Sequence, residues 1–115
     1  MNNQPNIDRI IQRLEDDYQS GQLRIFLHKK SKDYLKAHRL TIDAMIQMAI
    51  SQLSNNHYYR GPSPHHWKAH LTVYEFITMI DDSDMYIKFD IGPEFSQIES
   101  FHSREKPINF TWTYH

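Results

Sequence analysis

The sequence predicts an α+β fold in which helices pack on one face of a small antiparallel β-meander. In the first half of the chain, apolar residues recur every three or four positions, as they do along one face of a helix. In the second half, apolar and polar residues alternate in three runs that short turn-forming links separate. The length of 115 residues suits one domain, so residues 1–115 are expected to form a single unit.

The first predicted helix covers residues 6–21, where isoleucine, leucine and tyrosine side chains form one apolar stripe. Asn6 is a residue type that accepts hydrogen bonds from the free N–H groups at a helix start, and Gly21 is typical of a helix end. Residues 23–28 follow, with β-branched and aromatic side chains that favour a short strand.

Two further helices are expected before the meander. Residues 31–40 are predicted to form a short helix with Ser31 as its N-cap, and residues 41–53 a longer helix with Thr41 as its N-cap. The longer segment places its isoleucine, methionine, alanine and leucine side chains on one face, which we expect to lie in the core. The methionines are expected to fill space there.

Residues 54–68 interrupt this periodicity, because they include Gly61, Pro62 and Pro64, and we expect a long loop there. Long ordered loops are more often functional than short ones. The alternating runs after the loop are predicted to be the strands of the meander, at residues 69–80, 84–91 and 95–102. The aromatic tail, residues 103–115, is expected to be extended.

The middle strand of the meander separates two kinds of side chain. Its alternation directs apolar side chains to the core and Tyr86, Lys88 and Asp90 to the opposite face, which the helices would leave free. His102, in the next strand, is expected beside Tyr86 and Lys88 across the sheet. Such a polar row is most often an ordinary exposed face. Together with Arg60 on a nearby loop, however, it forms a candidate site for proton and phosphate chemistry.

The charge is unevenly distributed along the chain. The net charge is −1, but residues 23–73 carry a net charge of +6, against −2 for residues 1–22 and −5 for residues 74–115. A basic segment can attract a polyanion even when the total charge is close to zero, although the same charges also occur on ordinary solvated faces. An acidic rim formed by the last third of the chain would repel RNA.

Composition argues against several classes of protein. The chain has no cysteine, which excludes disulfides and thiolate metal sites. No apolar run approaches the roughly 20 residues that cross a membrane. The N-terminal residues show no basic region followed by an apolar one, so we expect no signal peptide and a cytoplasmic location.

His65, His66 and His70 form the pattern H-H-x-x-x-H, in which two histidines four positions apart could bind zinc if they shared a helix face. Pro64 precedes them and a strand is predicted after them, so a shared helix face is not expected. The segment also lacks the glutamate of H-E-x-x-H. We therefore expect no metal and no other cofactor.

The remaining polar residues suit RNA cleavage without a metal ion. The chain contains no G-x-S-x-G element, no glycine-rich phosphate loop and no paired-carboxylate signature. The 2′-hydroxyl of RNA supplies the nucleophile, so a protein needs only a base, an acid and cations at the phosphate. His102 could move protons, while Arg60 and Lys88 hold the phosphate. Aromatic side chains such as Tyr59 and Trp67 could stack unpaired bases, although such side chains more often simply pack.

Four segments, LSNNHYYRGPSPHHW, TVYEF, MYIKFDI and SFHSREKPINF, follow one another along the chain. Together they resemble the MqsR family of bacterial toxin–antitoxin toxins, over about residues 7–110. The resemblance implies a RelE-like fold and a toxin that cuts mRNA at short sequences, without metal and often without a ribosome. It also implies neutralisation by a cognate antitoxin, MqsA-like in character.

The resemblance also assigns site residues position by position. The family's active-site lysine in the [FY]-[YV]-[KR] element falls on Arg60. The tyrosine and lysine of the Y-[IV]-K element fall on Tyr86 and Lys88, and the basic residue of S-F-[KH] falls on His102. Arginine clamps phosphate but cannot act as a base, so His102 is the predicted proton-transfer group and Arg60 is electrostatic. Tyr86 is expected to donate a hydrogen bond to phosphate, or a proton.

One further polar position of the family, near its W-x-D-V-Y element, has no clear counterpart, and Lys68, His70 and Thr72 are candidates for it. The residues expected to contact the substrate are Tyr59, Trp67, Lys68 and His70. The predicted function is a sequence-specific mRNA endoribonuclease acting as a toxin. The alternative is a non-enzymatic module that binds protein or RNA with the same sheet face.

Overall fold

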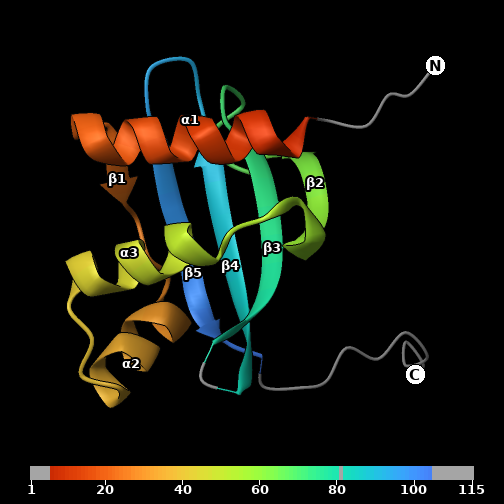
Figure 1. The fold of residues 1–115 in the computed structure, drawn as a ribbon. Coiled ribbons are helices and arrows are strands. Elements are labelled where there is room, and N and C mark those ends of the chain that lie inside the picture. The colour runs from red at the N-terminus through yellow and green to blue at the C-terminus, as the bar shows by residue number, and fades with distance from the viewer. Residues whose placement is uncertain (1–5, 81, 105–115) are drawn as a thin grey trace, which may run out of the picture.

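The structure is a computed structural model that describes residues 6–80 and 82–104 (Figure 1). Within these residues the chain forms three α-helices, one 3₁₀-helix and five strands. Their bounds are α1 Ile7–Ser20, β1 Leu23–Ile25, α2 Lys29–Ala37, α3 Ile42–Gln52, η1 Asn55–His57, β2 Tyr58–Pro64, β3 Thr72–Ile80, β4 Ser83–Ile91 and β5 Ser96–Ser103.

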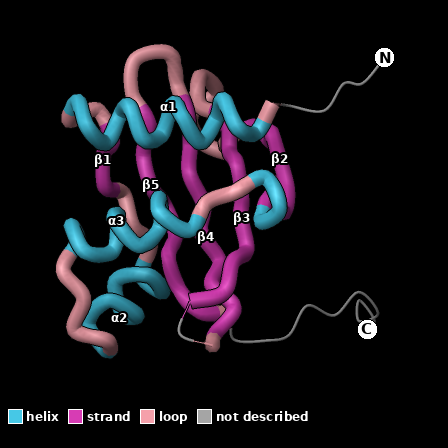
Figure 2. The backbone as a smooth tube through the Cα atoms, in the orientation of Figure 1, coloured by secondary structure: helices cyan, strands magenta, loops and turns pink. Residues whose placement is uncertain are grey.

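The strands form one sheet in the order β1-β5-β4-β3-β2. β3, β4 and β5 are successive antiparallel neighbours, so the predicted meander is confirmed. β2 extends it on one edge, and β1 joins the other edge as a parallel partner of β5. α1 and α3 cross in front of the sheet, and α2 lies near the lower end of β5 (Figure 2). The fold is therefore α+β as predicted, with a mixed rather than a purely antiparallel sheet.

Two of the predicted N-caps, Asn6 and Thr41, are confirmed, as is the predicted end of the first helix at Gly21. The side-chain oxygen of Asn6 accepts the backbone N–H of Arg9 at 3.3 Å, and α1 ends at Gly21, whose φ of 79° is readily adopted only by glycine. At the start of α3, Thr41 Oγ1 accepts the backbone N–H of Ala44 at 3.1 Å. Each N-cap satisfies an N–H group that the helix itself leaves without an acceptor.

The predicted cap of the second helix is wrong. α2 begins at Lys29, so Ser31 lies within its first turn instead of preceding it. Ser31 is fully buried, and its Oγ accepts the backbone N–H of Phe101 at 2.7 Å. A contact with β5, some 70 positions away, takes the hydroxyl that local propensity would assign to capping.

The prediction of a loop over residues 54–68 is also wrong, because η1 and β2 together occupy most of it. β2 pairs with β3 on one side only, so its outer backbone groups need no strand partner and prolines are tolerated there. At Gly61, φ is 128° and an added Cβ would lie 2.6 Å from the carbonyl oxygen of Val73. Glycine is therefore required at this position of β2, which lies against the backbone of β3.

The core lies between the sheet and the helices. Met85, Ile87 and Phe89 of β4 are fully buried, as the alternation predicts, and they belong to the same buried cluster as Leu14 of α1 and Met45 of α3. Burying each such side chain contributes about 1.5–3 kcal/mol. The core thus fixes which residues of β4 point the other way, towards the candidate site.

The remaining boundaries differ by a few residues from those predicted. The strand expected from residue 69 begins at Thr72, because Leu71 closes a turn through its N–H to Lys68 O at 3.0 Å. The short strand expected at 23–28 spans Leu23–Ile25. The predicted extended tail lies mostly outside the described residues. None of the described helices is long and apolar enough to cross a membrane.

Candidate active site

The face of the sheet opposite the core carries a groove over β2, β3 and β4, with a volume of about 290 Å³. A smaller pocket adjoins it towards β5 and the start of α2. His66, Val73 and Lys88 line both, so the two adjoin, and together we call them the sheet-face groove. The groove proper is also lined by Arg60, Ser63, Pro64, Glu75 and Tyr86, and the pocket by His28, His65, Trp67 and Glu99.

A glutamate that the sequence analysis did not single out is central to the groove. In strand register, Glu75 of β3 lies between Arg60 on β2 and Lys88 on β4. Arg60 Nε and Nη2 donate to the two carboxylate oxygens of Glu75, at 3.0 Å each, and Tyr86 Oη donates to Glu75 Oε1 at 2.5 Å. Arg60 and Tyr86, predicted as neighbours, are thus brought together through a shared carboxylate.

This arrangement fixes the charge states of the three groups. Burial by itself would raise the pKa of Glu75, but the hydrogen bonds from Arg60 and Tyr86 outweigh it and hold that pKa below the ordinary value. Burial, and then the hydrogen bond to Glu75, raise the pKa of Tyr86 well above its ordinary value. Tyr86 therefore keeps its proton near neutral pH and acts as a hydrogen-bond donor.

Lys88 occupies the middle of the sheet-face groove. It pairs with Glu75 on one side and with Ser100 on the other, and its Nζ lies 3.8 Å from Glu99 Oε1. Because it lines both parts of the groove, a phosphate bound in either part lies within reach of its charge. The predicted placement of Lys88 beside Tyr86 on this face is confirmed.

His102 lies at the edge of this group. It pairs with Tyr86 in strand register, as predicted, and the centroids of the two rings are 5.5 Å apart. Its Nδ1 donates to Ser103 O at 3.0 Å, and its ring lines a separate pocket beside α2. His102 therefore lines neither part of the sheet-face groove and borders it at Tyr86.

The residues predicted to contact the substrate differ in their position relative to the groove. The side chain of Trp67 is 86% exposed at the rim of the small pocket, and Lys68 Nζ lies 4.9 Å from the ring centroid of Phe26. Tyr59 is exposed with the Arg60 guanidinium 5.1 Å from its ring centroid. Tyr59, Lys68 and His70 line neither part of the groove, and His70 packs edge-on against Phe95.

The buried side chains His65, Asp90 and Glu99 place one possible ligand atom each within 4.8 Å of one another. However, His65 Nδ1 accepts the backbone N–H groups of Trp67 and Lys68 at 3.0 and 3.1 Å, so the ring proton is on Nε2. Nε2 faces the carboxylates of Asp90, at 3.7 Å, and Glu99, at 3.4 Å. A metal-bound histidine has the opposite arrangement, with its unprotonated nitrogen towards the ion. The donor set suits shared protons better than a metal.

Asp90 was predicted on the free face, and this is wrong, because His65 from the β2–β3 connection lies against it and Asp90 is fully buried. Asp90 Oδ2 accepts from Gln97 Nε2 at 2.6 Å, and Oδ1 has no hydrogen-bond partner among the described residues. Burial and the neighbouring Glu99 raise the pKa of Asp90, whereas hydrogen bonds keep the pKa of Glu99 low. The pair thus holds one proton, on Asp90, and one negative charge, on Glu99.

The shared proton predicts a pH dependence of stability. Because Asp90 binds its proton more tightly in the folded state, that proton stabilises the fold. The contribution is complete below the unfolded pKa of Asp90, about 3.9, and it is lost as pH rises through the raised folded pKa. Asp90→Asn mimics the protonated acid, so its urea midpoint should fall less than that of the wild type between pH 5 and pH 9. The difference between the free energies of unfolding of the two proteins should grow by at most about 1.4 kcal/mol per pH unit. Parallel pH profiles for the two proteins would contradict the assignment of the proton.

Three residues of the site, Glu75, Glu99 and His28, were not predicted from the sequence. Only Glu75 has a local signal that could have identified it. Glu75 shares an alternating face with Val73 in a predicted strand, and this signal could have found it. Glu99 lies at an irregularity between two β4–β5 pairs, which alternation does not reveal. His28 reaches the pocket through a parallel pairing with β5 that connects distant parts of the sequence.

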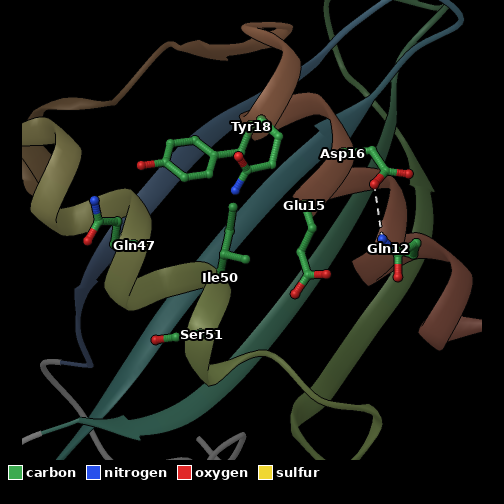
Figure 3. Close-up of a pocket in the computed structure, with 8 residues that line it drawn as sticks. Gln12, Glu15, Asp16, Tyr18, Gln47, Ile50 and Ser51 are labelled. Atoms are coloured by element: carbon green, nitrogen blue, oxygen red, sulfur yellow. Dashed lines mark hydrogen bonds between the residues drawn. The ribbon is translucent and has the colours of Figure 1, made fainter.

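A second groove lies between α1 and α3 on the helical side (Figure 3). Its volume, about 410 Å³, exceeds that of the sheet-face groove. Its charged lining residues are acidic, Glu15 and Asp16, and the other side chains include the amides of Gln12 and Gln47. Negative charge repels phosphate, so this groove is no candidate for RNA in spite of its size.

No protein-family model matches the chain, and no curated protein sequence matches it significantly. A proposal of function therefore depends on the geometry of the sheet-face groove and on the expectations drawn from the sequence.

Proposed function

We propose that the chain is a metal-independent mRNA endoribonuclease that acts as the toxin of a toxin–antitoxin pair, with a RelE-like fold. The observation that carries the proposal is the gathering of Arg60, Lys88 and Tyr86 in one open groove beside the exposed Trp67. Two cations and a neutral donor suit a phosphodiester, and an exposed indole suits an unpaired base.

The reaction needs no nucleophile from the protein. The RNA 2′-oxygen attacks the adjacent phosphorus while the bond from phosphorus to the 5′-oxygen breaks, which leaves a 2′,3′-cyclic phosphate and a 5′-hydroxyl. Lys88 and Arg60 stabilise the negative charge that gathers on the phosphoryl oxygens, and Tyr86 donates a hydrogen bond. His102 exchanges a proton with the reacting oxygens. The antitoxin, proposed to be MqsA-like, would prevent RNA from entering the groove.

One observation favours the alternative, a non-enzymatic binding module. Both groove cations already face carboxylates, Arg60 at Glu75 and Lys88 at Glu99. RNA phosphate must therefore compete with an internal anion for each of them. We favour the enzyme because the side chain of Arg60 is 62% exposed, so a phosphate can approach it without the departure of Glu75.

Expression of the chain in a bacterial host separates the two functions. The wild type should arrest growth and deplete mRNA, whereas His102→Ala should be tolerated, because loss of one acid–base group lowers cleavage by about 10²–10⁴. Growth curves and total RNA profiles, at matched protein levels, measure the difference. If both proteins accumulate in folded form while growth continues, the chain is not a toxin and the binding module is the better assignment.

A further inference from the structure

His28 lies in the connection between β1 and α2, beside β5. The backbone N–H of Phe26 donates to Ile98 O at 3.0 Å, and that of His28 donates to Glu99 O at 3.1 Å. These bonds continue the pairing of β1 with β5 beyond Ile25. The position of His28 is therefore set by the sheet, although the residue lies in a connection.

The imidazole of His28 is held by a buried carboxylate. His28 Nε2 lies 2.6 Å from Glu99 Oε1, and the side chain of Glu99 is 4% exposed whereas that of His28 is 51% exposed. An ionised carboxylate only accepts hydrogen bonds, so Nε2 is the donor. In the neutral ring, Nδ1 is then the nitrogen that carries a free lone pair. A carboxylate that fixes the tautomer of an exposed imidazole is the arrangement by which proteins prepare histidine to accept a proton.

Glu99 is itself held from several sides, which keeps it ionised. Burial opposes its charge, but the neighbouring Asp90, the hydrogen bond from His28 and the nearby Lys88 and His65 keep its pKa below the ordinary value. His65 can only donate towards it, because the other ring nitrogen accepts two backbone N–H groups. Of these partners, His28 is the half-exposed imidazole that lines the pocket.

The same carboxylate oxygen links His28 to the phosphate-binding part of the groove. Glu99 Oε1 lies 2.6 Å from His28 Nε2 and 3.8 Å from Lys88 Nζ. A phosphate at Lys88 would therefore place its neighbouring ribose beside the imidazole. The exposed Trp67, at the rim of the same pocket, offers a ring on which the base of that nucleotide can stack.

We propose that His28 is the general base of the cleavage reaction and that Glu99 is its positioning residue; this inference rests on the proposed endoribonuclease function. His28 Nδ1 takes the proton of the 2′-hydroxyl as the 2′-oxygen bonds to phosphorus. The bond from phosphorus to the 5′-oxygen breaks, and that oxygen receives a proton from His102, which lies on the other side of Lys88 along β4 and β5. The role assigned to His102 is then that of the acid.

The test uses variants that preserve the contact with Glu99. In His28→Gln the side-chain amide can donate to Glu99 as Nε2 does, but it cannot accept a proton. His28→Ala removes the side chain and leaves space for added imidazole. His38→Gln, an exposed histidine at the end of α2, is the matched control. Each purified protein is tested for cleavage of single-stranded RNA from pH 5 to pH 9 and for binding of the same oligonucleotide with 2′-deoxy substitutions, which cannot be cleaved.

His28→Gln should cleave about 10²–10⁴ times more slowly than the wild type and bind the uncleavable oligonucleotide with an affinity within about threefold. The limb of its pH–rate profile that reports the base should disappear. Added imidazole should raise the rate of His28→Ala and leave the wild type unchanged. Glu99→Gln should lower kcat more than it changes KM, because the imidazole remains but is no longer held.

Three results would overturn the inference. If His28→Gln cleaves like the wild type with an unchanged pH profile, His28 is not the base, while the endoribonuclease function stands. If His28→Gln loses binding of the uncleavable oligonucleotide to the same extent as cleavage, its role is binding rather than proton transfer. A folded wild type that leaves all RNA intact would instead overturn the proposed function, and the inference with it.

Discussion

Replacement of Lys88 by methionine should lower the rate of RNA cleavage by about 10²–10³, the usual cost of removing one group that stabilises charge in a transition state. Lys88 lines both parts of the sheet-face groove, and its ammonium is held near Glu99. Methionine keeps the length and the apolar stem of the side chain, so the loss can be attributed to the charge. Initial rates on a single-stranded RNA measure the effect.

The matched control is Lys32→Met, which removes the same charge from an exposed position on α2. It should cleave at nearly the wild-type rate, apart from the small effect of one charge on long-range attraction. If Lys88→Met and Lys32→Met lose activity equally, the groove is not where the phosphate reacts.

Arg60→Met should affect both activity and stability. Cleavage should fall by about 10²–10³, because a second phosphate cation is lost. The free energy of unfolding should fall by about 1–3 kcal/mol, because Glu75, whose side chain is only 8% exposed, loses a bidentate partner. Urea denaturation and initial cleavage rates measure the two effects on the same protein.

The double variant Arg60→Met with Glu75→Gln separates these effects. Replacing the carboxylate by an amide removes the unpaired charge, so most of the lost stability should return, while cleavage should stay low. Recovery of cleavage together with stability would mean that Arg60 acts only as a structural partner of Glu75.

The sequence was most informative where the two-residue period of a strand decides the outcome. The placement of Tyr86 and Lys88 opposite the core, and of His102 beside Tyr86, follows from alternation and from the short links of the meander. These inferences need only neighbouring strands. They succeeded because a slip by one residue would have buried the polar set in the core.

The errors have a common physical origin in contacts between distant segments. Ser31 bonds to Phe101, Asp90 is covered by His65, and residues expected to form a loop pair with β3 as an edge strand. Local propensity carries no information about such partners. The contact of His28 with Glu99 is of the same kind, since it depends on a parallel pairing across 71 positions.

The most direct test of the central claim is cleavage by the purified wild type. The protein, shown to be folded, is incubated with a long single-stranded RNA with and without EDTA, and the ends of any fragments are mapped and chemically identified. We expect cuts at a recurrent short sequence, unchanged by EDTA, that leave 2′,3′-cyclic phosphate and 5′-hydroxyl ends. RNA that stays intact, or fragments that vanish when EDTA is added, would contradict a metal-independent endoribonuclease in the sheet-face groove.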